Sequence, residues 1–70
     1  MEKIIELIIN GFKETIAENM TISKLIFRYR EGDAALIVEH NGRFVYPRKY
    51  GEIILLNGDR IEFINPNFGG

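Results

Sequence analysis

Apolar and polar residues alternate on both sides of three Asn-Gly dipeptides, which lie at residues 10–11, 41–42 and 57–58. Asn and Gly tolerate the positive φ angles that a two-residue type I′ turn requires at both central positions. Because apolar, often β-branched residues flank each dipeptide, each one predicts a β-hairpin. The three expected hairpins join Lys3–Ile9 to Phe12–Ala17, Leu36–His40 to Arg43–Tyr46, and Glu52–Leu56 to Asp59–Asn65.

The segment between the first two hairpins follows a helical period instead. The spacing i, i+3, i+4, i+7 of one helix face is occupied by Ile22, Leu25, Ile26 and Tyr29. Thr21 is suited to the N-cap because its hydroxyl can accept a free backbone N–H, and Gly32 can end the helix in a left-handed conformation. The order of hairpin, helix and two strand pairs predicts an α+β roll, a sheet with one helix across one face.

Alternation in the first and last strands assigns the two faces of this sheet. The residues expected to face the core are Ile5, Leu7, Ile9, Ile61 and Phe63. Ile4, Ile8 and Ile64 then point away from the helix and form a possible docking surface for a partner protein. The alternative is that the loop Tyr46–Glu52 covers part of this face.

Length, charge and cysteine content restrict the class of protein. Seventy residues make one domain, and the absence of cysteine excludes disulfides, thiolate metal sites and thiol nucleophiles. The formal net charge is −1 with basic and acidic residues interleaved, whereas nucleic-acid-binding proteins gather a basic excess on one face. The apolar runs are far shorter than the roughly 20 residues that a bilayer requires. We therefore expect a cytoplasmic protein, monomeric when free, that binds neither nucleic acid nor membrane.

The polar residues do not form a recognisable catalytic or metal-binding motif. His40 is the only histidine; no triad surrounds it, and we interpret it as a solvent-facing residue at a strand end. Asp59 and Glu62 are interpreted as a charged hairpin edge rather than an acid/base pair. Arg28-Tyr29-Arg30 and Arg48-Lys49 are interpreted as solvated surface rather than phosphate sites. We therefore expect no catalytic residue, no metal and no resident cofactor.

The last five residues are expected to form a mobile tail, 66–70, after a domain that spans residues 1–65, because Pro66 cannot donate to a sheet ladder. No side chain from Phe63 onward is charged, so the α-carboxylate is the tail's only charge. Five extended residues reach at most about 17 Å, and glycines without Cβ can enter a narrow channel. Two interpretations stay open: a tail that carries Gly70 into a partner's active site, with Phe68 as an anchor, and an incidental disordered end.

Several short motifs occur in a characteristic order along most of the chain. They are Ile9-Asn10-Gly11, Met20-Thr21-Ile22 before Leu25, Val38 to Gly42, Pro47-Arg48, Asn57 to Glu62, and the terminal Gly69-Gly70. In this order and spacing the chain resembles the small sulfur carriers typified by ThiS and MoaD, and it is closer to ThiS. The resemblance implies a ubiquitin-like β-grasp roll, in which one helix packs across one face of a mixed sheet of four to five strands.

The resemblance also implies a function and partners. A ubiquitin-activating-like enzyme would use its own ATP to adenylate the carboxylate of Gly70, and sulfur would then displace AMP to give a thiocarboxylate. Gly69 would give clearance, and a sulfur-accepting synthase would take the sulfur for cofactor biosynthesis, with thiamine thiazole ahead of a molybdopterin-type product. The chain itself would not be an enzyme. Two alternatives stay open: a ubiquitin-like modifier of lysines and a non-covalent β-grasp interaction module.

Overall fold

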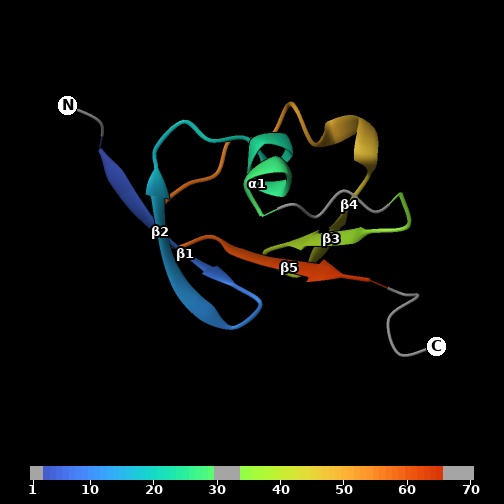
Figure 1. Cartoon of the computed structure of the whole chain (residues 1–70), viewed down its shortest axis with the longest axis horizontal. Helices are drawn as coiled ribbons and strands as arrows, with labels where there is room; N and C mark the ends of the chain where they lie inside the picture. The colour runs from blue at the N-terminus through green and yellow to red at the C-terminus, as the bar shows by residue number, and fades with distance from the viewer. Residues whose placement is uncertain (1–2, 30–33, 66–70) are drawn as a thin grey trace.

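A computed structural model describes residues 3–29 and 34–65 of the chain. In this part of the chain a five-stranded sheet has the strand order β2-β1-β5-β3-β4, and one α-helix packs on it (Figure 1). The elements are β1 (Ile4–Ile9), β2 (Phe12–Ala17), α1 (Ile22–Arg28), β3 (Ile37–His40), β4 (Arg43–Val45), the short 3-10 helix η1 (Pro47–Lys49) and β5 (Arg60–Ile64). β1 and β5 are parallel and the other pairs are antiparallel, so the sheet is mixed and the predicted α+β roll is confirmed.

The first two predicted hairpins are confirmed. β1 pairs with β2 from Ile4↔Ala17 to Ile9↔Phe12, and β3 pairs with β4 from Val38↔Val45 to His40↔Arg43. Positive φ angles occur at both central residues of each turn: Asn10 at 49°, Gly11 at 87°, Asn41 at 52° and Gly42 at 82°. These angles are the ones that the right-handed twist of the flanking strands demands of a two-residue connection.

The third predicted hairpin is wrong. Residues 52–56 do not form a strand against β5; their only described pairing is the isolated bridge between Ile54 and Thr21. In the turn that follows, the Asp59 amide donates to the Leu56 carbonyl, and only Gly58 has a positive φ. That pattern is typical of a type II turn, which does not match the twist of a hairpin. β5 therefore pairs with two strands that are distant in sequence, β1 and β3.

The predicted helix is confirmed over Ile22–Arg28, together with its N-cap. The hydroxyl of Thr21 accepts a hydrogen bond from the Lys24 amide at 3.1 Å. Ile22 and Leu25 are fully buried against the sheet, as the helical spacing predicted. Gly32, the predicted C-terminal residue, lies outside the described residues.

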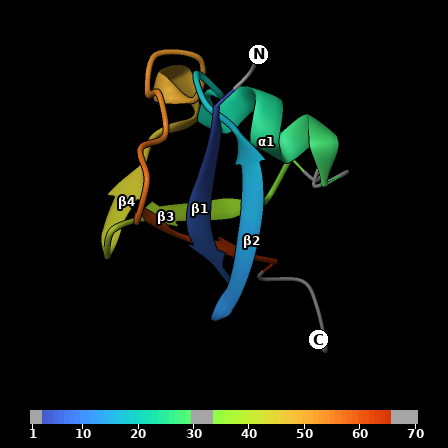
Figure 2. The same ribbon diagram turned by 90° about the vertical axis from the view of Figure 1, so that its left-hand side faces the viewer.

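The core lies between α1 and the sheet. Four of the five predicted core residues, Leu7, Ile9, Ile61 and Phe63, are buried there, whereas Ile5 is only partly buried. The loop that contains η1 lies on the same side of the sheet as α1 (Figure 2), where the Ser23 amide donates to the Tyr50 carbonyl. The alternative that this loop covers the opposite face is therefore wrong.

Candidate functional site

The tail residues of the predicted site, Gly70, Gly69 and Phe68, lie outside the described residues. The chain leads toward them from β5, a central strand with β1 on one side and β3 on the other. Ile64 at the end of β5 pairs with Ile37, and Arg60 at its start pairs with Ile8. The surface around Ile64 and Ile37 is therefore the part of the sheet nearest to where residues 66–70 begin.

The structure places the three predicted docking residues on the sheet face opposite α1, but it does not bring all three together. Ile4 is 62% exposed, Ile64 is 38% exposed, and Ile8 is partly buried. Because Ile8 is level with Arg60 in the parallel pair β1–β5, Ile4 and Ile64 are offset by eight positions along the sheet. At about 3.3 Å per residue this separates them by roughly 26 Å.

Ile37 is a tail-side surface residue that the sequence reasoning missed. It is partly buried and lies directly opposite Ile64 in the β3–β5 pair. Alternation within residues 36–40 was the available signal, since Leu36 and Val38 are buried and the residue between them points to the other face. Ile64 and Ile37 thus form the aliphatic pair closest to the end of β5.

His40 and Asp59 join the end of β3 to the turn before β5. His40 Nε2 lies 2.8 Å from Asp59 Oδ2, and the two side chains are only 23% and 12% exposed. The same carboxylate accepts hydrogen bonds from the Leu56 amide at 2.9 Å and from Asn41 Nδ2 at 3.1 Å. The prediction that His40 faces solvent is therefore wrong: its ring is largely shielded and holds a neighbouring carboxylate.

The electrostatics of Asp59 follow from these contacts. Burial would raise the pKa of its carboxyl, but the hydrogen bonds from His40, Leu56 and Asn41 favour the ionised form, and the pKa is lowered overall. All three hydrogen-bond donors to this carboxylate, His40, Asn41 and Leu56, belong to the end of β3, the turn after it and the turn before β5. We interpret the cluster as a structural tie rather than a reactive centre.

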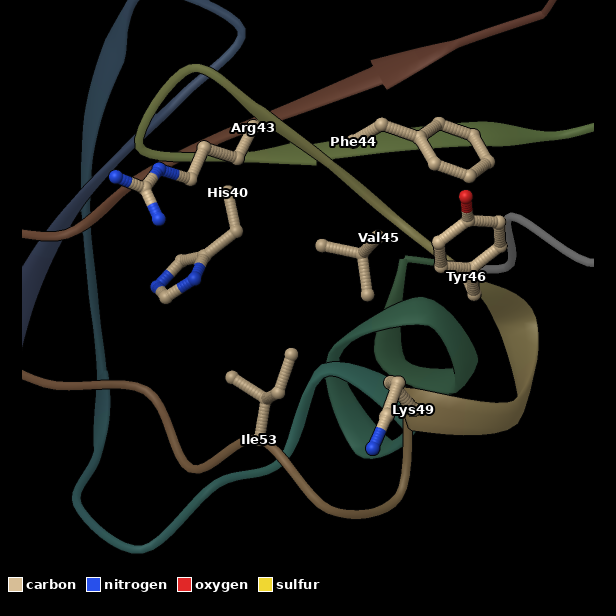
Figure 3. Close-up of a pocket in the computed structure, with 7 residues that line it drawn as sticks. All are labelled: His40, Arg43, Phe44, Val45, Tyr46, Lys49 and Ile53. Carbon is tan, nitrogen blue, oxygen red and sulfur yellow. The ribbon is translucent and has the colours of Figure 1, made fainter.

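A pocket of roughly 200 Å³ lies beside β4. Figure 3 shows Val45 and Ile53 between His40 on one side and Tyr46 and Lys49 on the other. Arg43 and Phe44 complete its lining. The pocket runs along β4, which β3 separates from β5: Arg43 is level with His40 and Ile61, and Val45 is level with Val38 and Phe63.

The described residues offer no assembled metal or acid/base site. No group of three or more His, Asp or Glu side chains in residues 3–29 and 34–65 could hold a metal ion. Glu62 is exposed opposite Glu39 in the β3–β5 pair, whereas Asp59 is held by His40, so these two carboxylates are not brought together. No helix in the described ranges is long and apolar enough to cross a membrane.

Comparison with known proteins gives a family for this chain. Among solved structures, the crystal structure of the thiamine biosynthesis protein (ThiS) from Geobacter metallireducens is similar with a TM-score of 0.82 and 26% sequence identity, over 94% of this chain and 100% of that one. This likeness confirms the β-grasp arrangement of the mixed sheet and helix. No curated protein matches the chain significantly. The model of the ThiS family matches residues 3–70, which is nearly the whole chain and includes the terminal glycines, and the chain therefore belongs to the ThiS family.

Proposed function

We propose that this protein is a sulfur carrier of thiamine biosynthesis that bears sulfur as a thiocarboxylate on Gly70. The observation that carries the proposal is the match of the ThiS family model through residue 70, so that the terminal Gly69-Gly70 is part of the family pattern. The name of the similar structure, a thiamine biosynthesis protein, supports the same pathway. The absence of cysteine from the sequence fits a carrier whose sulfur is held by the C-terminus.

The proposed chemistry uses the terminal carboxylate as the only reacting group of this chain. An oxygen of the Gly70 carboxylate attacks the α-phosphorus of ATP on an activating enzyme, and pyrophosphate leaves. A sulfur nucleophile then attacks the carbonyl carbon of the acyl adenylate, and AMP leaves with the C–O bond electrons. Gly69 has no Cβ, which lets the tail enter a narrow channel in either enzyme. In this proposal ATP belongs to the partner, and the carrier is not itself an enzyme and has no resident cofactor.

Two partner proteins follow from this scheme: a ubiquitin-activating-like adenylating enzyme and a synthase that accepts the sulfur, both met in the cytoplasm. We propose that each contacts the sheet face that carries Ile64 and Ile37, because that aliphatic pair lies beside the start of the tail. Ile8 lies on the same face farther along β1, and Ile4 is too distant to share one small contact with Ile64. A surface of this kind allows transient docking, in which a monomeric carrier moves between two enzymes.

The direct test is reconstitution with the activating enzyme from the same host, ATP and a sulfide source, followed by intact mass measurement. We expect a mass increase of one oxygen-to-sulfur exchange, localised to the C-terminal peptide. Deletion of Gly70, or addition of one residue after it, should abolish the product while the far-UV and near-UV circular dichroism stay unchanged. An extended protein that still gains sulfur would contradict the proposal, and so would adducts to lysines as the only product.

A further inference from the structure

β4 is the outermost strand on one side of the sheet, and in the described part of the chain nothing pairs with its outer edge. In an antiparallel ladder, hydrogen-bonded and non-bonded pairs alternate, and the pair that flanks a two-residue turn is bonded. Here His40↔Arg43 flanks the turn, so the next pair, Glu39↔Phe44, is the non-bonded one. The N–H and C=O of Phe44 therefore point to the free edge.

The side chains on the two sides of this edge differ in kind. On one side Phe44 and Tyr46 form an edge-to-face aromatic pair with ring centroids 4.9 Å apart, and Arg48 lies 5.0 Å from the centre of the Tyr46 ring. The two residues are 52% and 55% exposed. On the other side are Val45 and Ile53, which line the pocket that Phe44 and Tyr46 border (Figure 3). A strand laid along this edge would alternate its side chains between the face of the aromatic pair and the face of Val45 and Ile53.

The segment that contains β4 and η1 is positive in a chain whose formal net charge is −1, although Glu39 of β3 lies opposite Phe44. Residues 40–51 include Arg43, Arg48 and Lys49 but no Asp or Glu. Besides the contact of His40 with Asp59, Lys49 pairs with Glu52 at 3.6 Å; both of these side chains are exposed, and such pairs contribute little to stability. β2, the other edge strand, has adjacent Lys13 and Glu14 and so has no single sign of charge.

We propose that the β4 edge is a second docking site, which binds an extended acidic segment of a partner protein by strand addition. Backbone groups of that segment bond to Phe44, one apolar side chain enters the pocket, and neighbouring carboxylates face Arg43, Arg48 and Lys49. A pocket of roughly 200 Å³ suits one side chain, because small-molecule sites usually span about 300–1,000 Å³.

The position of this site would allow a second partner to bind while the C-terminal tail is in use. It lies at the outer edge of the sheet, where β3 separates β4 from β5, whereas the tail follows Ile64 at the end of β5. A strand added outside β4 is three strand spacings, about 14 Å, from β5, which leaves the start of the tail uncovered. The carrier can thus be retained by one protein while its C-terminus is in the active site of another.

The test is an NMR titration of the full-length, ¹⁵N-labelled protein with a blocked eight-residue peptide in which valine and glutamate alternate. We expect the largest amide shifts at residues 43–46, with smaller ones at Lys49 and Ile53, and a dissociation constant of roughly 0.1–1 mM, as for a small interface. The same peptide with lysine in place of glutamate should bind at least about tenfold more weakly. Absence of shifts up to about 5 mM glutamate peptide, well above that range, would overturn the proposal.

Variants separate this site from the rest of the molecule. The double variant Arg43→Glu/Lys49→Glu changes only exposed side chains and should weaken binding of the glutamate peptide at least about tenfold. Lys13→Glu, at the opposite edge, is the matched control and should bind normally. Deletion of Gly70 should also have no effect, so the proposal stands or fails independently of the sulfur-carrier role. Shifts centred on β2 or around Ile8, or equal binding by the double variant, would refute it.

Discussion

The imidazole of His40 and the carboxylate of Asp59 are in contact, with Nε2 2.8 Å from Oδ2, although 19 residues separate them in sequence. An ionised carboxylate can only accept, so the imidazole donates in this pair. The Leu56 amide donates to the same oxygen, and Asn41 donates to the other one. Asp59 therefore fixes the turn before β5 against the turn between β3 and β4.

Replacement of Asp59 with Asn is predicted to destabilise the fold. The variant keeps the size of the side chain but loses the ionised acceptor that three donors share. Because the bonds from Leu56 and Asn41 are exposed and the one from His40 is partly buried, we expect a loss of about 1–1.5 kcal/mol in the free energy of unfolding. Urea unfolding at pH 7 measures this difference. Glu62→Gln is the matched control: Glu62 is exposed on the other face, and its change should stay within about 0.5 kcal/mol. An equal effect of both variants would show that the cluster is not a structural tie.

The lowered pKa of the Asp59 carboxyl predicts how the stability of the fold depends on pH. Its pKa in the folded protein is lowered from the ordinary value of 3.8, so folding favours the ionised form. Its contribution is fully present above pH 3.8 and is lost as the pH falls through the folded pKa. The difference in unfolding free energy between the wild type and Asp59→Asn should therefore be constant from pH 7 to about pH 5 and shrink below pH 4. A difference that grows on acidification would contradict the assigned sign.

Replacement of Asn10 with Gly is also predicted to destabilise the fold, because the Asn10 side chain extends the β1–β5 ladder beyond the last residue of β1. Its Oδ1 accepts a hydrogen bond from the Phe63 amide at 2.8 Å, while its own amide donates to the Ile61 carbonyl. Asn10→Gly retains access to the positive φ but removes the acceptor, and should lower the unfolding free energy by about 1–3 kcal/mol. Asn19→Gly is the control, since Asn19 also has a positive φ, of 66°, but no described side-chain hydrogen bond. Thermal unfolding of both variants distinguishes the two effects.

The sequence predicted what depends on local pattern and failed where a side chain acts at long range. Two hairpins, the helix with its Thr21 cap and most of the core follow from spacing and turn chemistry alone. The three Asn-Gly dipeptides look alike in sequence, yet Asn57 uses its Oδ1 to accept the Glu6 amide 51 residues away. This contact, with the Gly58 amide donating to the Glu6 carbonyl, fixes the third turn against β1 instead of folding residues 52–56 onto β5. Nothing in the local pattern distinguishes that turn from the other two.

The candidate site was predictable to the same extent. The family resemblance predicted a role for Gly70, which lies outside the described residues, and alternation put Ile4, Ile8 and Ile64 on one face. Alternation cannot give the register between β1 and β5, however, because that pairing joins strands from opposite ends of the chain. The register of β1 and β5 separates Ile4 from Ile64, and the register of β3 and β5 places Ile37 beside Ile64. His40 was misjudged for the same reason, since its partner comes from the turn before β5.

Replacement of Ile64 with Asp is predicted to slow thiocarboxylate formation while the fold is preserved. Ile64 is 38% exposed beside the start of the tail, so a charge there is tolerated by the free protein but becomes buried against a docked enzyme. We expect a loss of roughly tenfold or more in kcat/KM for the activating enzyme, equivalent to about 1.4 kcal/mol. Ile4→Asp is the matched control, since Ile4 lies on the same face, is more exposed and is roughly 26 Å away by the sheet spacing. Equal effects of the two variants would show that docking extends along the whole face rather than centring on the tail, and no effect of Ile64→Asp would exclude this surface.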